Sequence, residues 1–178
     1  FERGGGGIGF VAHINKEPSN QNIKDALSIL CKMDHRGARG AEPNSGDGAG
    51  ILTGMPHAFF AKISKELYAT DLLSGSYSVG NIFLPNNEGE GEACKTFLEE
   101  TCSRNELKIV GWRTLPIDIE KADIGPTALD AMPHIEQVLI VDNLKNCDQE
   151  DFEKRLYLTR KKASNHRRSH SAVSYTKL

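Results

Sequence analysis

A glycine-rich stretch at residues 35–50 holds the residues of this sequence best suited to chemistry. It reads His-Arg-Gly-Ala-Arg-Gly-Ala-Glu-Pro-Asn-Ser-Gly-Asp-Gly-Ala-Gly, with five of the 17 glycines of the chain beside two arginines and two acids. Glycine adopts positive φ angles freely and lets the backbone approach a small molecule or another strand closely. We interpret the stretch as a shaped loop.

The glycines allow other interpretations. An ordinary surface connection stays open for 35–50, because glycine-rich connections are common. A phosphate-binding P-loop is disfavoured, since no lysine follows these glycines. Residues 4–9 match G-x-G-x-x-G, but only three residues precede them and a strand-like segment follows, whereas a dinucleotide site needs a strand before the motif and a helix after it.

The elements around the loop follow from hydrophobic spacing. Apolar residues at helical spacing predict a helix over 19–33, with Ser19 or Asn20 as its N-cap. Segments 10–14 and 50–55 are predicted as strands, and Pro56 opens the next helix. The loop is therefore expected between a helix and a strand.

The second half of the chain repeats the alternation of strands and helices. A loop with turn signals is predicted over 117–133. Period-two patterns predict strands at 77–84, 107–115 and 135–141. Apolar residues at helical spacing predict a helix after the acidic turn at 88–92 and another over 149–163.

Composition excludes several classes of protein. At 178 residues, with 38% hydrophobic and 26% charged residues and a net charge of −2, the chain suits one globular domain without bias toward nucleic acid or membrane. The four cysteines and six histidines form no metal-binding spacing, so no metal is expected. Cys31 is expected to be buried in its helix, in a reducing compartment. Because the chain begins with Phe1, it is expected to be a fragment or a processed form.

Several separated motifs resemble one family. The chain is similar to the N-terminal glutaminase domain of glutamate synthases, a class II glutamine amidotransferase, in three motifs of its first half. These are Gly-Ile-Gly-Phe-Val-Ala-His at 7–13, Met-Asp-His-Arg-Gly-Ala at 33–38 and Pro-Asn-Ser-Gly-Asp-Gly-Ala-Gly-Ile-Leu at 43–52. The similarity spans about residues 6–164 and includes 111–113, 125–129, 135–138 and 152–157. Residues 165–178 are expected to be a divergent basic tail.

The resemblance implies a fold and an activity. The implied fold is α+β, a four-layer αββα sandwich of two antiparallel sheets of the N-terminal-nucleophile hydrolase type, here incomplete at its C-terminus. The implied activity is hydrolysis of L-glutamine to glutamate and ammonia, for glutamate biosynthesis and ammonia assimilation.

The resemblance also implies partners and a location. In the full-length enzyme a synthase domain would receive the ammonia, using FMN, an iron–sulfur cluster and NAD(P)H or ferredoxin, whereas this chain is expected to hold no cofactor. No nucleic acid or membrane partner is expected. The expected location is a reducing intracellular compartment, either the cytoplasm or the plastid stroma.

The family's nucleophile position carries a departure. The family places a cysteine directly before Gly-[Val/Ile]-Gly-Phe, where its own α-amine, of unperturbed pKa about 7.7 to 8.0, can activate the thiol. That position is Gly6. Loss of a nucleophile can cost about a million-fold in turnover, and loss of one oxyanion donor about 10² to 10³. With the downstream oxyanion segment also expected to be absent, the chain is predicted to be nearly inactive.

The resemblance assigns the remaining site residues. Arg36 matches the arginine beside the nucleophile and is predicted to be catalytic and substrate-binding, since a guanidinium is a rigid donor fork. The loop residues predicted to bind substrate are Gly46, Asp47, Gly48 and Gly50. Alternatively, Arg36 and Asp47 only brace the loop. Arg39 stands where the family usually has a small residue or cysteine.

Two other hypotheses stay open. The chain could be a non-catalytic module that binds glutamine or another protein, or a variant of an active enzyme whose position 6 should be cysteine. A Gly6→Cys substitution with an exposed terminus separates these hypotheses.

Overall fold

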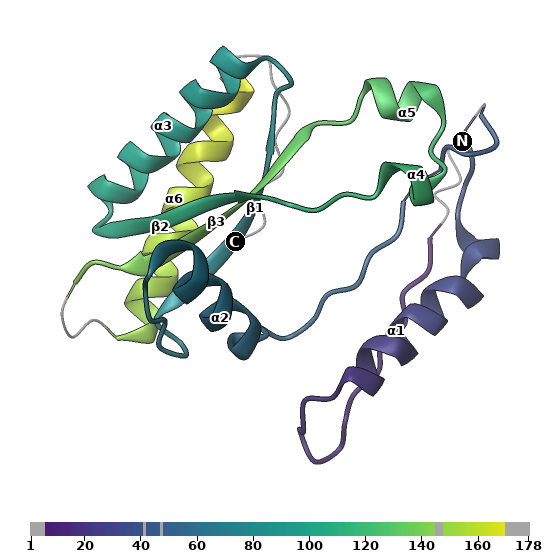
Figure 1. Cartoon of the computed structure of the whole chain (residues 1–178), viewed down its shortest axis with the longest axis horizontal. Helices are drawn as coiled ribbons and strands as arrows, with labels where there is room; N and C mark the ends of the chain where they lie inside the picture. Colours follow the sequence, from purple (N-terminus) through teal and green to yellow (C-terminus); the bar gives the residue numbers. More distant parts are fainter. Residues whose placement is uncertain (1–5, 41, 47, 145–147, 170–178) are drawn as a thin grey trace. The chain divides into compact units, whose positions relative to one another are not determined.

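The computed structural model describes residues 6–40, 42–46, 48–144 and 148–169 (Figure 1). The chain divides into two compact units. The first, here called the loop unit, comprises Phe1–Pro56 and Asp118–Met132. The second, here called the sheet unit, comprises His57–Ile117 and Pro133–Leu178.

The sheet unit is built on three antiparallel strands. Its strands are β1 (Tyr77–Leu84), β2 (Leu107–Thr114) and β3 (His134–Asp142), in the order β1-β3-β2. The central strand β3 pairs Leu139 with Val79 of β1 and with Gly111 of β2. All three predicted strands of this half are therefore confirmed, within a residue or so at their ends.

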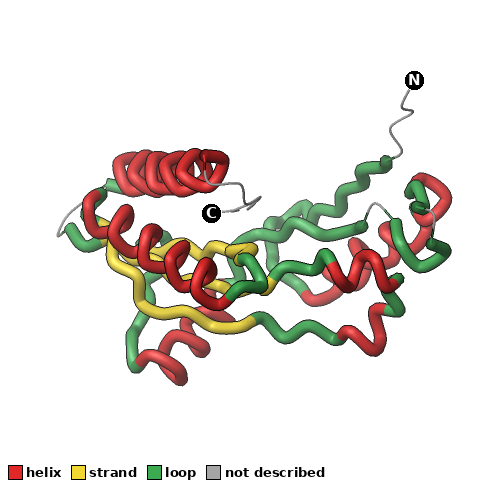
Figure 2. Tube along the Cα trace, turned by 90° about the horizontal axis from the view of Figure 1, so that it is seen from above, coloured by secondary structure: helices red, strands yellow, loops and turns green. Residues whose placement is uncertain are grey.

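Helices cover both faces of this sheet, which Figure 2 shows as yellow strands between red helices. Helices α3 (Glu88–Arg104) and α6 (Gln149–Ser169) lie on one face, and α2 (His57–Tyr68) lies on the other. Alternate residues of β3 reach the two cores, so Val138 and Ile140 pack toward α3 and α6 while Leu139 packs toward α2. The α+β class with an antiparallel sheet is confirmed, and the second sheet of a sandwich stays a prediction.

A bulge and a glycine in β2 let α2 approach the sheet. The register of β2 against β3 shifts between Ile109 and Gly111. A Cβ atom on Gly111 would lie 2.2 Å from Cε1 of Tyr68, and the Tyr68 hydroxyl donates to the Trp112 carbonyl at 2.7 Å. Because glycine has no Cβ, the Tyr68 ring can lie directly on the β2 backbone. Trp112 itself packs against the core beneath α3 and α6.

The loop unit has helices but almost no core. It contains α1 (Asn20–Lys32), the 3₁₀ turn η1 (Asp34–Arg36), α4 (Ile119–Ala122) and α5 (Pro126–Asp130). The predicted first helix and its cap are confirmed, because the Ser19 side chain accepts a hydrogen bond from the Asn22 amide at 3.3 Å. Among the described residues of this unit, Gly125 alone is buried.

Two predicted strands of the loop unit were wrong. Residues 10–14 and 50–55 have strand-like sequences but form no strand. A period-two pattern gives a segment only a preference for extended backbone, whereas a strand also needs a neighbouring strand to pair with its backbone hydrogen-bonding groups. The apolar side chains there lie in solvent, with Phe10 90% and Leu52 80% exposed.

Three smaller expectations are also corrected. The last helix does not end near 163, because α6 continues to Ser169. The segment 117–133 is not only loop, since it contains α4 and α5. Cys31 is exposed rather than buried, as no residue of α1 is buried among the described part of the chain.

Neither unit contains, in its described part, a helix of the length and apolar character that crossing a membrane requires.

Candidate functional site

The structure brings two predicted site residues together. Arg36 is the last residue of η1, directly after α1. Its Nε atom donates a hydrogen bond to the carbonyl oxygen of Gly6 at 3.3 Å, across 30 residues of sequence. The contact places an exposed guanidinium beside the position predicted for the nucleophile.

Glycines in the N-terminal segment allow this contact. A Cβ atom on Gly9 would lie 2.6 Å from Cγ2 of Ile29, and one on Gly7 would lie 3.0 Å from Sδ of Met33. The distance at Gly9 is shorter than real Cβ contacts and the one at Gly7 is tighter than most, so the backbone at both glycines lies close to the side chains of Ile29 and Met33. The glycines at 7 and 9 therefore serve close packing and position residue 6 beside Arg36.

Position 6 is open. No described atom lies within 4 Å of an ideal Cβ at Gly6. A Cβ atom would therefore fit there without displacing a described neighbour. As the sequence stands, position 6 supplies a carbonyl group to Arg36 and no nucleophile.

The glycine-rich loop folds back on itself at its first half. Arg39 and Gly46 form an isolated β-bridge, and the Gly40 amide donates to the Ser45 carbonyl at 2.8 Å. A Cβ atom on Gly46 would lie 3.0 Å from the Ala38 carbonyl oxygen, so a side chain there would crowd the bridge. The close approach to Ala38 therefore favours glycine at position 46.

The rest of the loop is exposed. Gly48 has φ of +79°, a conformation that favours glycine. Gly50 is exposed and an ideal Cβ on it has no described neighbour within 4 Å. No described contact joins Gly46, Gly48 or Gly50 to Arg36. Asp47 lies outside the described residues, so its predicted role stays a prediction.

Glu42 holds the loop to the start of α5. Its carboxylate accepts hydrogen bonds from the Thr127 amide at 3.3 Å, from the Thr127 hydroxyl, and from the Ser45 hydroxyl at 2.8 Å. These bonds favour the ionised form, so they lower the pKa of Glu42, the Thr127 side chain having the largest effect and Ser45 the next. Glu42 and Thr127 are 85 residues apart in sequence.

Two further contacts complete this attachment. The Asn44 side-chain amide donates to the Asp123 carboxylate at 3.0 Å, and the Gly125 amide donates to the Asn44 carbonyl at 3.4 Å. A Cβ atom on Gly125 would lie 2.1 Å from Oε2 of Glu42 and 2.5 Å from Oγ of Ser45. A side chain at position 125 would therefore have to displace the Glu42 carboxylate and the Ser45 hydroxyl from where they lie. We call the set Glu42, Asn44, Ser45, Asp123, Gly125 and Thr127 the loop clasp.

Sequence reasoning missed the loop clasp. It used Gly125 and Pro126 as a turn signal and as part of the family resemblance at 125–129, and it assigned Glu42 no role. A usable signal was present, because proline just after a glycine is typical of the first turn of a helix, whose free amides donate hydrogen bonds to an acidic partner. Nothing along the chain, however, identified Glu42 as that partner.

No cluster of three or more potential metal ligands occurs among the described histidines, cysteines and acids. The expectation of no metal remains a prediction.

Comparison with known proteins adds the family. The model of the family described as glutamine amidotransferases class II matches residues 6–177. That range begins at Gly6 and includes nearly all of 165–178, the stretch predicted to diverge.

Curated relatives match most of this chain. The NADH glutamate synthase of Schizosaccharomyces pombe is 36% identical over 92% of the chain, and the large chain of the NADPH enzyme of Bacillus subtilis is 34% identical over 93%. The chloroplastic ferredoxin-dependent glutamate synthase of Oryza sativa subsp. japonica is 36% identical over 90%. The matched part is 8%, 11% and 10% of these three proteins respectively, so the chain spans about a tenth of their length.

Proposed function

This chain belongs to the class II glutamine amidotransferases, and on that premise we propose that it is the glutaminase domain of a glutamate synthase. The reaction of such a domain is hydrolysis of the side-chain amide of L-glutamine to glutamate and ammonia. The observation that carries the proposal is the hydrogen bond from Arg36 to Gly6, because it joins the family's arginine motif to the family's nucleophile position.

Gly6 determines what this chain does by itself. A cysteine at position 6 would attack the amide carbon of glutamine, with its own free α-amine as the base. Glycine has no side chain to attack with, so the chain is proposed to keep the arginine and the glycine loop while hydrolysing no glutamine. Arg36 would then orient residue 6 through its carbonyl group or hold a substrate carboxylate.

The complete domain is proposed to be a four-layer αββα sandwich. Two observations support a further layer. The sheet of the sheet unit has two edge strands, β1 and β2, and the loop unit exposes Phe10, Ile14 and Leu52, which are 80% to 95% exposed. Apolar surface of this kind is normally covered in a finished fold.

The ammonia is proposed to pass to a synthase domain of the full-length protein, which would use FMN and an iron–sulfur cluster. The relatives are named for NADH, NADPH and ferredoxin, so either a nicotinamide or ferredoxin is the proposed reductant. A reducing compartment, cytoplasm or plastid stroma, is proposed for the chain.

A restored nucleophile tests the proposal. A Gly6→Cys chain processed so that the introduced cysteine is its first residue should release glutamate and ammonia from glutamine. The gain over the Gly6 chain processed in the same way should be about 10³- to 10⁴-fold, because the roughly million-fold effect of a nucleophile is reduced by about 10² to 10³ for the missing oxyanion segment. The matched control is the Gly6→Cys chain that retains residues 1–5, whose blocked amine should leave it much less active. A correctly processed, folded Gly6→Cys chain without glutaminase activity would contradict the proposal.

A non-catalytic glutamine-binding module is the second candidate, favoured by the loss of a side chain at position 6 alongside an intact loop clasp. Glutamine at about 100 times its dissociation constant should raise the free energy of unfolding by roughly 2.7 kcal/mol. A melt of the unaltered chain that moves up with glutamine, together with an inactive, processed Gly6→Cys chain, would favour this candidate.

A further inference from the structure

Arg113 on β2 is held in place by a row of side chains across the sheet. Its Nε atom donates to Oε1 of Gln137 at 2.8 Å, and Gln137 lies opposite it on β3. The Gln137 Nε2 atom in turn donates to Oδ1 of Asn81 on β1 at 2.9 Å. Gln137 is only 6% exposed, so this amide has a fixed orientation with its oxygen toward Arg113.

The guanidinium is also held from the side of α2. Its Cζ atom lies 5.6 Å from the centre of the Phe59 ring, within cation–π range. Among the described residues, its Nη1 and Nη2 atoms have no hydrogen-bond or ion-pair partner. Arg113 is therefore an oriented, partly buried cation whose two terminal nitrogens are unused.

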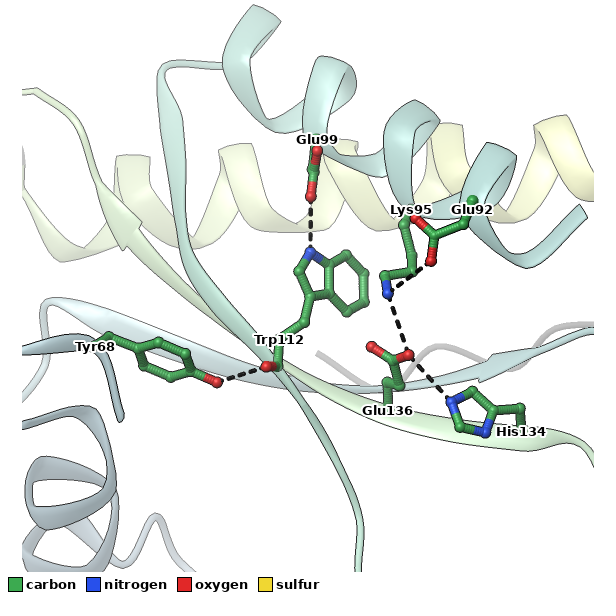
Figure 3. A network of polar contacts seen from close by, with 7 residues as sticks. All are labelled: Tyr68, Glu92, Lys95, Glu99, Trp112, His134 and Glu136. Atoms are coloured by element: carbon green, nitrogen blue, oxygen red, sulfur yellow. Dashed lines mark hydrogen bonds and ion pairs between the residues drawn. The ribbon is translucent and has the colours of Figure 1, made fainter. Parts of the chain in front are cut away.

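Two other partly buried cations of the sheet unit have carboxylate partners. Lys95, with 18% of its side chain exposed, pairs with Glu92 at 3.1 Å and Glu136 at 3.2 Å (Figure 3). Arg155, 12% exposed, pairs with Asp142 and Asp151, both at 2.8 Å. Removing a cation from water is costly unless an anion compensates it, and Arg113 has only a neutral amide.

No acidic residue of β3 forms an ion pair with Arg113 among the described contacts. Glu136 is next to Gln137 in sequence, but alternate residues of a strand point to opposite faces. Glu136 points toward α3, where it contacts Lys95 and His134 (Figure 3). Arg160 is also partly buried without a described carboxylate, but it has only a contact with the Tyr157 ring and no described hydrogen bond to orient it.

We propose that Arg113 binds a carboxylate group through Nη1 and Nη2. Two parallel N–H groups of a guanidinium match the two oxygens of a carboxylate. One cation beside neutral amides suits a single negative charge better than a phosphate dianion, which usually recruits several cations. The carboxylate comes either from a free small acid or from an aspartate or glutamate side chain of a second protein chain.

The test is a titration of the full chain with succinate at constant ionic strength, with chloride replaced by succinate. The Nε–Hε resonance of Arg113 should shift saturably. Arg113→Lys keeps the positive charge but removes the two parallel N–H groups of the guanidinium, so it should weaken succinate binding about tenfold or more. Gln137→Glu places a carboxylate beside Arg113 and should suppress binding in a folded chain. Arg104→Lys, on the exposed side of α3 where Arg104 pairs with Glu100, is the matched control and should bind normally.

Sedimentation separates the two sources. Succinate binding without self-association assigns a free small acid. Self-association that Arg113→Lys abolishes and succinate competes away assigns a protein side chain. The proposal is overturned if succinate produces no saturable shift and the chain shows no Arg113-dependent association, or if the Arg113→Lys chain binds succinate as tightly as the unaltered one.

Discussion

Single atoms decide whether the glycine-rich loop can be attached to α5. At Gly125 the missing Cβ leaves room for the Glu42 carboxylate and the Ser45 hydroxyl. At Gly6 the missing Cβ leaves open space and no nucleophile. The same residue type thus has a packing role at one position and a chemical consequence at the other.

Gly125→Ala should detach the loop from α5. The added methyl group overlaps Glu42 and Ser45, and overpacking of this kind typically costs about 1 to 3 kcal/mol. Amide hydrogen exchange should show faster exchange at residues 42–46 and at Thr127. Gly54→Ala is the control, because an ideal Cβ at Gly54 has no described neighbour within 4 Å; equal effects of the two substitutions would refute this account of the loop clasp.

The loop clasp should also respond to pH through Glu42. Hydrogen bonds, first of all from the Thr127 hydroxyl, lower the pKa of Glu42 from its ordinary value of 4.5. Because the folded pKa lies below the unfolded one, the stabilisation is present above about 4.5 and is lost as the pH falls through the folded pKa. An NMR titration should show the Thr127 amide resonance following the Glu42 carboxyl.

Glu42→Gln is the control for that titration. It keeps the size of the side chain and removes its ionisation, so the acid transition at the Thr127 amide should disappear. A transition that persists in the Glu42→Gln chain would assign the pH response to another group.

At the scale of elements, the contact of α2 with β2 depends on one glycine in a bulged strand. The Tyr68 ring occupies the space where a Gly111 side chain would be, and its hydroxyl satisfies the Trp112 carbonyl at 2.7 Å. A bulge re-aims side chains along a strand, and here Ile109 and Trp112 both pack toward α3 and α6.

Gly111→Ala should therefore displace α2 and lower the free energy of unfolding by about 1 to 3 kcal/mol. Chemical denaturation followed by tryptophan fluorescence would measure the loss, because Trp112 is the only tryptophan of the chain. Gly89→Ala, in the exposed first turn of α3, is the control and should be neutral or slightly stabilising. Equal destabilisation by both would contradict the role given to Tyr68.

At the scale of the whole molecule, the two units differ in how much they bury. The sheet unit has cores on both faces of its sheet, whereas Gly125 alone is buried among the described residues of the loop unit. The free cysteines differ in burial in the same way, since Cys31 on α1 is exposed and Cys102 on α3 is 1% exposed.

Alkylation of the folded chain at mildly alkaline pH should modify Cys31 and spare Cys102. Burial is the main cause that raises the pKa of Cys102 to about 12, so little thiolate forms there, and the core shields the sulfur. Peptide mass spectrometry before and after denaturation provides the measurement, with full modification of Cys102 expected only after unfolding. Rapid modification of Cys102 in the native chain would show that the core around α3 opens readily.

The sequence by itself determined the family, the residue at the predicted nucleophile position, the strands of the sheet unit and the approximate places of its helices. Helix and strand patterns depend on residues close together in sequence, so α1 with its Ser19 cap and the strand 77–84 could be predicted from the local sequence. Separated motifs in the correct order identified the family without any structure.

Only the tertiary structure decided which distant groups meet. Glu42 bonds Thr127 across 85 residues, and Arg113 is oriented by Gln137 and Asn81 on two other strands. Spacing along the chain does not encode such pairs, because they depend on how the intervening elements pack. For the same reason residues 10–14 and 50–55 had the pattern of strands but not the neighbouring strand that would make them so.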